Sequence, residues 1–138
     1  MTKCEEAVAA AVELTRNAEK QLEAGTAEID SAPVRVGQSS DLKVLRDAIE
    51  WVGALTARLE ADSAGERLHD HLITAQGLQT VLSGAVDEIE GYEYTDPRNE
   101  ETVRRPPGSE TAALSALDGA SDDIDSAVEV LESCLEEA

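Results

Sequence analysis

Apolar residues recur along this chain at alternating intervals of three and four, the spacing that places one stripe on one face of an α-helix. Polar segments interrupt the alternation at three places, so the pattern defines separate helices rather than one long rod. We expect helices at residues 3–30, 41–60, 64–91 and 110–137.

The stripes consist mainly of Leu, Val, Ile and Ala. In the first helix they are Val8, Ala11, Thr15, Ala18, Leu22, Gly25 and Ile29. In the second they are Leu45, Ala48, Val52, Leu55 and Leu59, with Ile49 and Trp51 broadening the stripe. In the third they are Leu68, His71, Ala75, Leu78, Leu82, Ala85 and Ile89. In the fourth they are Leu114, Leu117, Ser121, Ile124, Val128, Leu131 and Leu135.

The first interruption contains a helix stop and a helix start. Pro33 and Gly37 end the first helix, and Ser39 or Ser40 can cap the second. Asp41 then lies in the first turn, where a negative charge is favourable. The sequence therefore predicts two helices here and not a continuous one.

The other two interruptions differ in length. After Leu59 the stripe loses its phase, and Ser63 with Glu66 forms a capping box, which predicts a tight turn at 61–64. Residues 92–109 contain Pro106-Pro107-Gly108 and are long for a connection within a compact domain, so we expect a flexible loop.

Four amphipathic helices of these lengths are typical of an all-α four-helix bundle. We expect a single domain over residues 1–138, with antiparallel up-down-up-down topology and the long loop before the last helix. The absence of Phe and the abundance of Ala fit closely packed helices better than a sheet.

The third predicted helix contains an unusual gap in charge. From His71 through Val86 there is no Asp, Glu, Lys or Arg, although 30% of the chain is charged. A helix without charge on any side is usually surrounded, either by its own bundle or by another subunit. Gly77, Ser83 and Gly84 would permit close approach of a neighbouring backbone. The candidate interface residues for a partner or a homodimer are His71, Ala75, Leu78, Leu82 and Ala85.

The net charge of −19 restricts the classes of partner. Such a field repels phosphates, so direct binding to nucleic acid is not expected. A solvated acidic surface, as in proteins adapted to high salt, is one explanation, and an acidic partner for a basic protein is another. No apolar run is long enough to span a membrane, and no secretory signal is recognisable at the start. We therefore expect a cytoplasmic protein, with secretion without a signal peptide as the alternative.

The chain has two cysteines, Cys4 and Cys134, near its opposite ends. An up-down-up-down bundle brings these ends together, so a disulfide is feasible. It would close a loop of about 130 residues and stabilise the fold by about 4 to 5 kcal/mol in the chain-entropy model. The alternative is two thiols kept reduced in the cytoplasm.

The segment Leu68-His69-Asp70, with Leu72 and a later AQGL, resembles the phosphoacceptor region of one class of histidine kinases. The resemblance implies that His69 accepts the phosphoryl group and that Asp70 assists removal of its proton. The stripe agrees, because His71 points inward and leaves His69 exposed. The alternative is a solvated His69 beside a partly buried His71 that is hydrogen-bonded to a neighbour.

Other catalytic and metal sites find little support. Glu66 and His69 form one E-x-x-H, but a di-iron bundle needs a second from another helix, and no other helix carries a histidine. Neither cysteine has a histidine near it in sequence, and no Gly-flanked serine elbow occurs. We therefore expect no metal, no cofactor and no catalytic residue, and a protein that is not an enzyme.

A second resemblance rests on Trp51-x-Gly53 and, about 40 residues later, Tyr92-x-x-x-Asp96. This pair of motifs is similar to that of small helical substrates of the type VII secretion system, in which the Trp-x-Gly occupies a hairpin turn. The resemblance implies export without an ordinary signal peptide. The alternative is that Trp51 is a core residue. The most consistent hypothesis is a non-enzymatic acidic bundle that acts through protein contacts or self-association.

Overall fold

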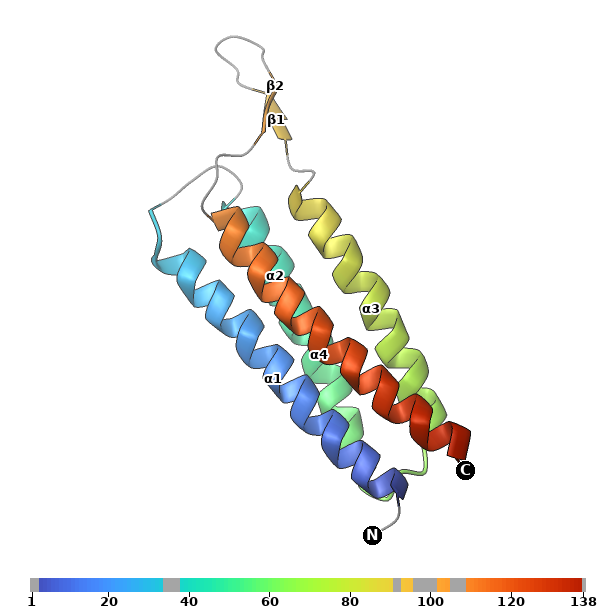
Figure 1. Ribbon diagram of the computed structural model, residues 1–138. Helices are drawn as coiled ribbons and strands as arrows, with labels where there is room; N and C mark the ends of the chain where they lie inside the picture. Colours follow the sequence, from blue (N-terminus) through green and yellow to red (C-terminus); the bar gives the residue numbers. More distant parts are fainter. Residues whose placement is uncertain (1–2, 34–37, 91–92, 96–101, 105–108, 138) are drawn as a thin grey trace.

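The chain forms an antiparallel four-helix bundle in a computed structural model, which describes residues 3–33, 38–90, 93–95, 102–104 and 109–137. The helices are α1 (Lys3–Ser31), α2 (Gln38–Glu60), α3 (Leu68–Glu90) and α4 (Ser109–Glu137). They run alternately up and down, so both ends of the chain lie at the same end of the bundle (Figure 1). The predicted all-α four-helix bundle is confirmed.

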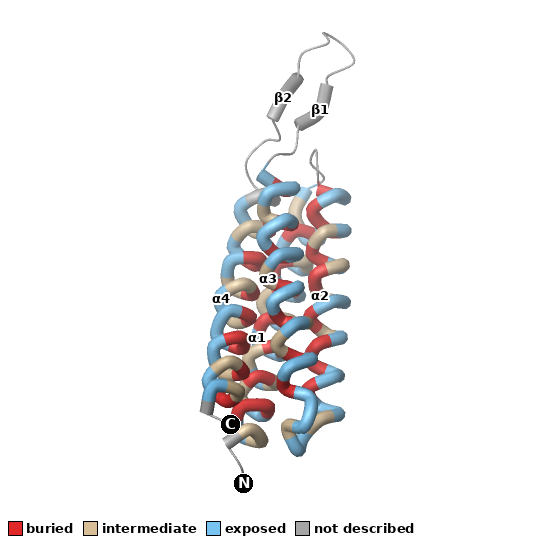
Figure 2. Tube along the Cα trace, turned by 90° about the vertical axis from the view of Figure 1, so that its right-hand side faces the viewer, coloured by how far each residue is buried: buried red, intermediate tan, exposed pale blue. Residues whose placement is uncertain are grey.

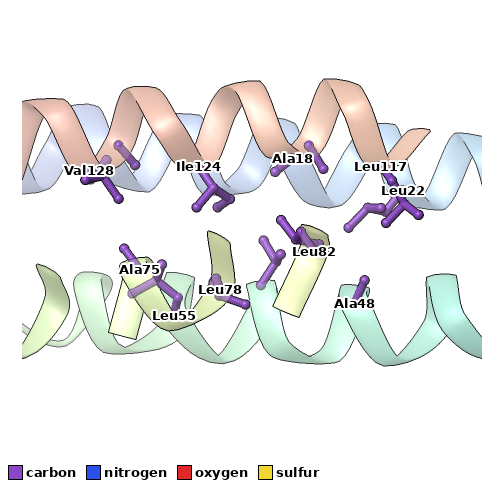
Figure 3. Packing of buried hydrophobic residues seen from close by; sticks show 14 of the residues in the cluster. Ala18, Leu22, Ala48, Leu55, Ala75, Leu78, Leu82, Leu117, Ile124 and Val128 are labelled. Atoms are coloured by element: carbon purple, nitrogen blue, oxygen red, sulfur yellow. The ribbon is translucent and has the colours of Figure 1, made fainter. Parts of the chain in front are cut away.

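The buried residues of the four helices face the interior of the bundle, and the exposed residues lie on its outside (Figure 2). The predicted stripe residues of α1, α2 and α3 are buried, apart from Ile49, which is partly buried, and Trp51, which is exposed. Figure 3 shows side chains of α1 and α4, such as Leu22 and Ile124, pointing toward those of α2 and α3, such as Leu55 and Leu82. The periodicity therefore identified the inward faces of these three helices.

The inward face of α4 is rotated from the prediction. Leu114, Ser121 and Leu135 are only partly buried, and small residues replace them in the core. These small core residues are Ala113, Ala116, Ala120, Ala127 and Cys134. Ala116 lies at close range to α1, since a Cβ built on Gly25 would lie 2.5 Å from the Cβ of Ala116. At this helix spacing, small side chains fill the interface that leucines would overfill.

The connection between α1 and α2 is held by a hydrogen bond from Gln38, a residue whose role was not predicted from the sequence. The amide Nε2 of Gln38, the first residue of α2, donates to the carbonyl oxygen of Ile29 at 2.6 Å. It thereby satisfies one of the carbonyls left open at the end of α1. Ser39 and Ser40 lie inside α2, so the prediction that one of them caps the helix at residue 41 was wrong.

The turn between α2 and α3 lies where it was predicted, but Asp62 organises it instead of Ser63. One carboxylate oxygen of Asp62 accepts from the backbone amide of Glu66 at 3.0 Å, and the other accepts from that of Arg67 at 2.8 Å. Gly65 has a φ of 71°, which only glycine adopts without cost. α3 consequently begins at Leu68, four residues later than predicted.

The connection between α3 and α4 contains a short antiparallel hairpin instead of an irregular loop throughout. β1 (Glu93–Thr95) pairs with β2 (Thr102–Arg104), and Tyr94 lies opposite Val103. The hairpin extends beyond the end of the bundle opposite the termini (Figure 1). The rest of the predicted loop at 92–109, apart from Ser109 at the start of α4, lies outside the described residues.

Candidate functional site

The described surface concentrates its large exposed apolar side chains in one place, along the junction of α2 and α3. They are Trp51, Ile73 and Val81, which are 45%, 55% and 37% exposed. Trp51 was predicted to lie in the core, and its exposure is a correction. Trp51 and Val81 line the same two adjoining hollows, and Ile73 lines a third. These hollows form what we call the α2–α3 groove.

The groove is continuous along most of the two helices. Its three hollows have volumes of about 310, 290 and 850 Å³. Trp51 and Val81 are shared by the first two hollows, and Arg58 and Thr74 by the last two. Arg58 also bridges the groove, because its guanidinium donates to the hydroxyl of Thr74 at 3.3 Å.

Two glycines of α3 keep the groove open. A Cβ built on Gly77 or Gly84 would meet nothing within 4 Å. The sequence predicted that these glycines admit a neighbouring backbone, either of the same chain or of another subunit, and within the described chain no backbone approaches them. The close approach occurs instead between α1 and α4 at Gly25. Gly77 and Gly84 are seven residues apart, so on one face of α3 they leave a shallow furrow that no described side chain of the bundle fills.

The end of the groove near the termini contains a buried polar pair. His71 is 3% exposed, and its Nε2 lies 2.7 Å from the carboxylate of Asp62. Since a carboxylate accepts, Nε2 carries the proton in the neutral ring. The other ring nitrogen, Nδ1, is buried and has no hydrogen-bond partner among the described residues. The pair closes the floor of the groove where α2 turns into α3.

Several interactions with opposing effects set the acidity of Asp62. Burial raises the pKa of the Asp62 carboxyl, but hydrogen bonds from the backbone amides of Arg67 and Glu66 and from His71 lower it. The hydrogen bonds prevail, and the pKa lies below the ordinary value of an aspartate. Asp62 therefore remains a carboxylate that holds the turn together at neutral pH.

The same end of the bundle carries the disulfide. The sulfur atoms of Cys4 and Cys134 are bonded at 2.09 Å and link the start of α1 to the end of α4. The α2–α3 turn packs against this link, because a Cβ built on Gly65 would lie 3.0 Å from the carbonyl oxygen of Cys4. The disulfide, the turn and the His71–Asp62 pair thus form one connected structural region.

The predicted phosphoacceptor residues lie on the first turn of α3. His69 and Asp70 are both exposed, whereas His71 is buried, as the stripe predicted. Asp70 lines the largest hollow of the groove. The exposed His69 and the buried His71 agree with the prediction from the stripe. No contact among the described residues identifies His69 as reactive.

The five predicted interface residues are buried in the bundle's own core. They are His71, Ala75, Leu78, Leu82 and Ala85. Their side chains meet other helices of the same chain, so the lack of charge around them reflects the core on one face of α3. α3 also has a second uncharged face, with Ile73, Gly77, Val81 and Gly84, which was not predicted although its intervals of three and four could have revealed it.

The residues of the export resemblance do not form one site in the described structure. Trp51 and Gly53 lie within α2, in the middle of a helix and not in a hairpin turn. Tyr92 and Asp96 lie outside the described residues. The geometry that the resemblance implies for Trp-x-Gly is therefore absent from α2.

The described residues contain neither a metal cluster nor a membrane-spanning helix, and the chain matches no known family. Among the described residues, no three His, Cys, Asp or Glu side chains are grouped to hold a metal ion. None of the described helices is long and apolar enough to cross a membrane. No protein-family model matches the chain, and no curated protein or solved structure is significantly similar to it.

Proposed function

We propose that this chain is a non-enzymatic acidic helical bundle that acts through protein–protein contacts made at the α2–α3 groove. The carrying observation is the gathering of Trp51, Ile73 and Val81 on one surface. A single exposed apolar residue is ordinary, but several along one furrow are typical of interaction surfaces. Tryptophan is moreover among the residues that contribute most to binding at interfaces.

The shape of the groove also supports recognition of a helix. Two adjacent antiparallel helices, with a glycine furrow on α3, offer a seat for the apolar stripe of a third helix, as in helix-in-groove recognition. The walls carry apolar side chains, and Gly77 leaves room between them. Charged residues lie mainly at the two ends of the groove, where they can determine orientation.

Site-specific photo-crosslinking in the source organism tests this function. A photoreactive amino acid at position 77 projects into open space and does not disturb the core. The matched control is position 27, an exposed alanine on α1. We expect a crosslinked species from position 77 and none from position 27. Equal yields at both positions, or none at either, would overturn the proposal.

Phosphotransfer through His69 remains the alternative from a different functional class. The supporting observation is that His69 and Asp70 are both exposed on the first turn of α3. This function predicts acid-labile phosphate on the protein after incubation with a cognate kinase, and its loss in His69→Gln. Retention of the phosphate in His69→Gln would exclude this residue.

Export without a signal peptide is the alternative to a cytoplasmic location, and the Cys4–Cys134 disulfide supports it. Disulfides persist mainly in oxidising compartments. Export predicts that the protein is recovered from culture medium with no free thiol. Recovery from the cytoplasm alone, with both thiols reduced, would favour the cytoplasmic location.

A further inference from the structure

The lining of the α2–α3 groove carries charges of both signs, although the protein as a whole is strongly acidic. Three of the chain's eleven basic residues line it, namely Lys43, Arg58 and Arg67. Five of the thirty acidic residues do so. Because the lining contains both signs of charge, a second copy of this chain can place its basic side chains beside acidic ones here.

The row of α2 side chains along the groove is self-complementary, which means that it matches the same row on a second, antiparallel copy. Asp47, Trp51, Ala54 and Arg58 follow one another on the face of α2 that lines the hollows. The midpoint between Asp47 and Arg58 falls between residues 52 and 53, and so does the midpoint between Trp51 and Ala54. A two-fold axis through that point would therefore exchange a negative end with a positive end.

The consequences of such an axis can be followed along the helix. Asp47 and Arg58 are eleven residues apart, or about 16 Å along the helix, so each lies about 8 Å from the axis. In an antiparallel pair, each Arg58 would lie beside Asp47 of the second copy. One turn further out, Val44 would lie beside Ala61 of the second copy, so an apolar residue again meets an apolar one.

The same axis places the tryptophan over the open part of the groove. Trp51 would lie beside Ala54 of the second copy, and Ala54 lines the central hollow with Gly77, Leu78 and Val81. This hollow is about 290 Å³ in volume and adjoins the glycine furrow of α3. Each indole would thus enter an apolar hollow of the other copy, at the centre of the interface where binding energy concentrates.

Resting on the proposed function, we infer that the occupant of the groove is a second copy of this chain. The two copies form an antiparallel two-fold dimer centred on residues 52 and 53 of α2. Such an interface is isologous, with the same surface contributed by both copies. Its stability rises with ionic strength, because salt screens the repulsion between two bodies that each carry a charge of −19.

Sedimentation equilibrium of the full chain tests the dimer over a range of concentrations and salt. At about 10 mM salt the Debye length is about 30 Å and repulsion keeps the copies apart, whereas at about 1 M it is about 3 Å. We expect monomer at low salt and dimer at high salt. Emission of the single tryptophan should shift to shorter wavelength as the dimer forms. Monomer at every salt and concentration would overturn the inference.

Charge reversal tests the two-fold geometry itself. Asp47→Arg and Arg58→Asp should each raise the dimer dissociation constant at least about fivefold, since each places like charges together twice. The double variant should return to within about threefold of the original value, because the pairs are restored with reversed signs. Glu13→Arg makes the same charge change as Asp47→Arg at an exposed site on α1 and should not weaken the dimer.

The outcomes separate this inference from the proposed function. If both single reversals weaken the dimer and the double variant does not recover, the interface is not the one described. If the protein is monomeric but position 77 crosslinks to another protein, the dimer is wrong and the interaction function stands. If it is monomeric and position 77 crosslinks to nothing, both are wrong.

Discussion

The imidazole Nε2 of His71 lies 2.7 Å from a carboxylate oxygen of Asp62, the residue that also accepts from two backbone amides of the α2–α3 turn. One carboxylate therefore serves two backbone amides and a buried ring. The turn in which it lies packs against Cys4 through Gly65. This arrangement makes Asp62 the residue on which the junction of α2 and α3 depends most.

Asp62→Ala is expected to lower the free energy of unfolding by about 2 to 4 kcal/mol. Loss of the acceptor for the two turn amides costs about 1 kcal/mol, and leaving the buried His71 Nε2–H without an acceptor costs about 1 to 3 kcal/mol more. Urea denaturation at neutral pH measures the difference. Asp118→Ala removes an exposed carboxylate from α4 and should change stability by less than about 0.5 kcal/mol.

The difference in the free energy of unfolding between Asp62→Ala and the original chain should also depend on pH. The pKa of Asp62 is lowered in the folded state, so its contribution to stability is complete above the unfolded pKa of about 3.9. The contribution is lost as the pH falls further, through the folded pKa. The two proteins should converge below about pH 4, and an unchanged gap there would show that the carboxylate charge is not what stabilises the turn.

Gly25, Gly65 and Gly77 differ in their surroundings, so replacing each with alanine should change the free energy of unfolding differently. Gly77→Ala should stabilise the protein by about 0.5 to 1 kcal/mol, because the site is helical and open. Gly25→Ala should destabilise it by about 1 to 3 kcal/mol, because the new methyl group would overlap with Ala116. Gly65→Ala should cost about 1 to 2 kcal/mol from its positive φ alone.

Thermal or urea denaturation of these variants separates two explanations of the glycines. If Gly25→Ala and Gly77→Ala have the same sign, helix propensity and not local packing decides the effect. Opposite signs would show that α1 and α4 are in close contact while α3 faces an open groove. Gly77→Ala is also small enough to test stability without filling the furrow.

Reduction of the Cys4–Cys134 disulfide should lower the free energy of unfolding by about 4 to 5 kcal/mol in the chain-entropy model. Cys4→Ser with Cys134→Ser should lower it to a similar extent. Because the α2–α3 turn packs on Cys4, amides near Gly65 should exchange faster with solvent after reduction. Free thiols in the unreduced protein, measured by alkylation and mass spectrometry, would contradict the bond.

Periodicity predicted the inward faces of α1 and α3, and that of α2 apart from Ile49 and Trp51, because each of these helices has one apolar stripe at intervals of three and four that it can bury. It was misleading for α4, where Leu114 and Leu135 drew attention to a face only partly in the core. The spacing between α1 and α4 depends on how closely Gly25 and Ala116 approach, which is a tertiary property. The sequence pattern of α4 alone therefore cannot predict this spacing.

The groove could be predicted only in part, for a different reason. The uncharged run in α3 was correctly singled out, but it covers two faces, and only the face with Ala75 and Leu82 enters the core. Whether the second face meets α2 or stays open depends on the distance between the two helices. The role of Asp62 was not predicted because Ser63 with Glu66 forms the more familiar capping signal. The positive φ of Gly65 shapes the turn in which the amide of Glu66 donates to Asp62 instead.

Glu19 in α1 provides a last test, because its charge is unfavourable in the folded protein. Burial and the nearby Glu23 raise the pKa of the Glu19 carboxyl, and the hydroxyl of Thr56 offsets this in part. A raised carboxyl pKa means that the ionised form destabilises the fold, and that this cost disappears as the pH falls through the folded pKa. Glu19→Gln should therefore stabilise the protein at neutral pH by about 0.2 to 0.5 kcal/mol, the typical cost of a like-charge pair one turn apart. In urea denaturation the gain should vanish at acidic pH, where Glu19 is protonated, and a gain independent of pH would mean that packing of the side chain, not its charge, is responsible.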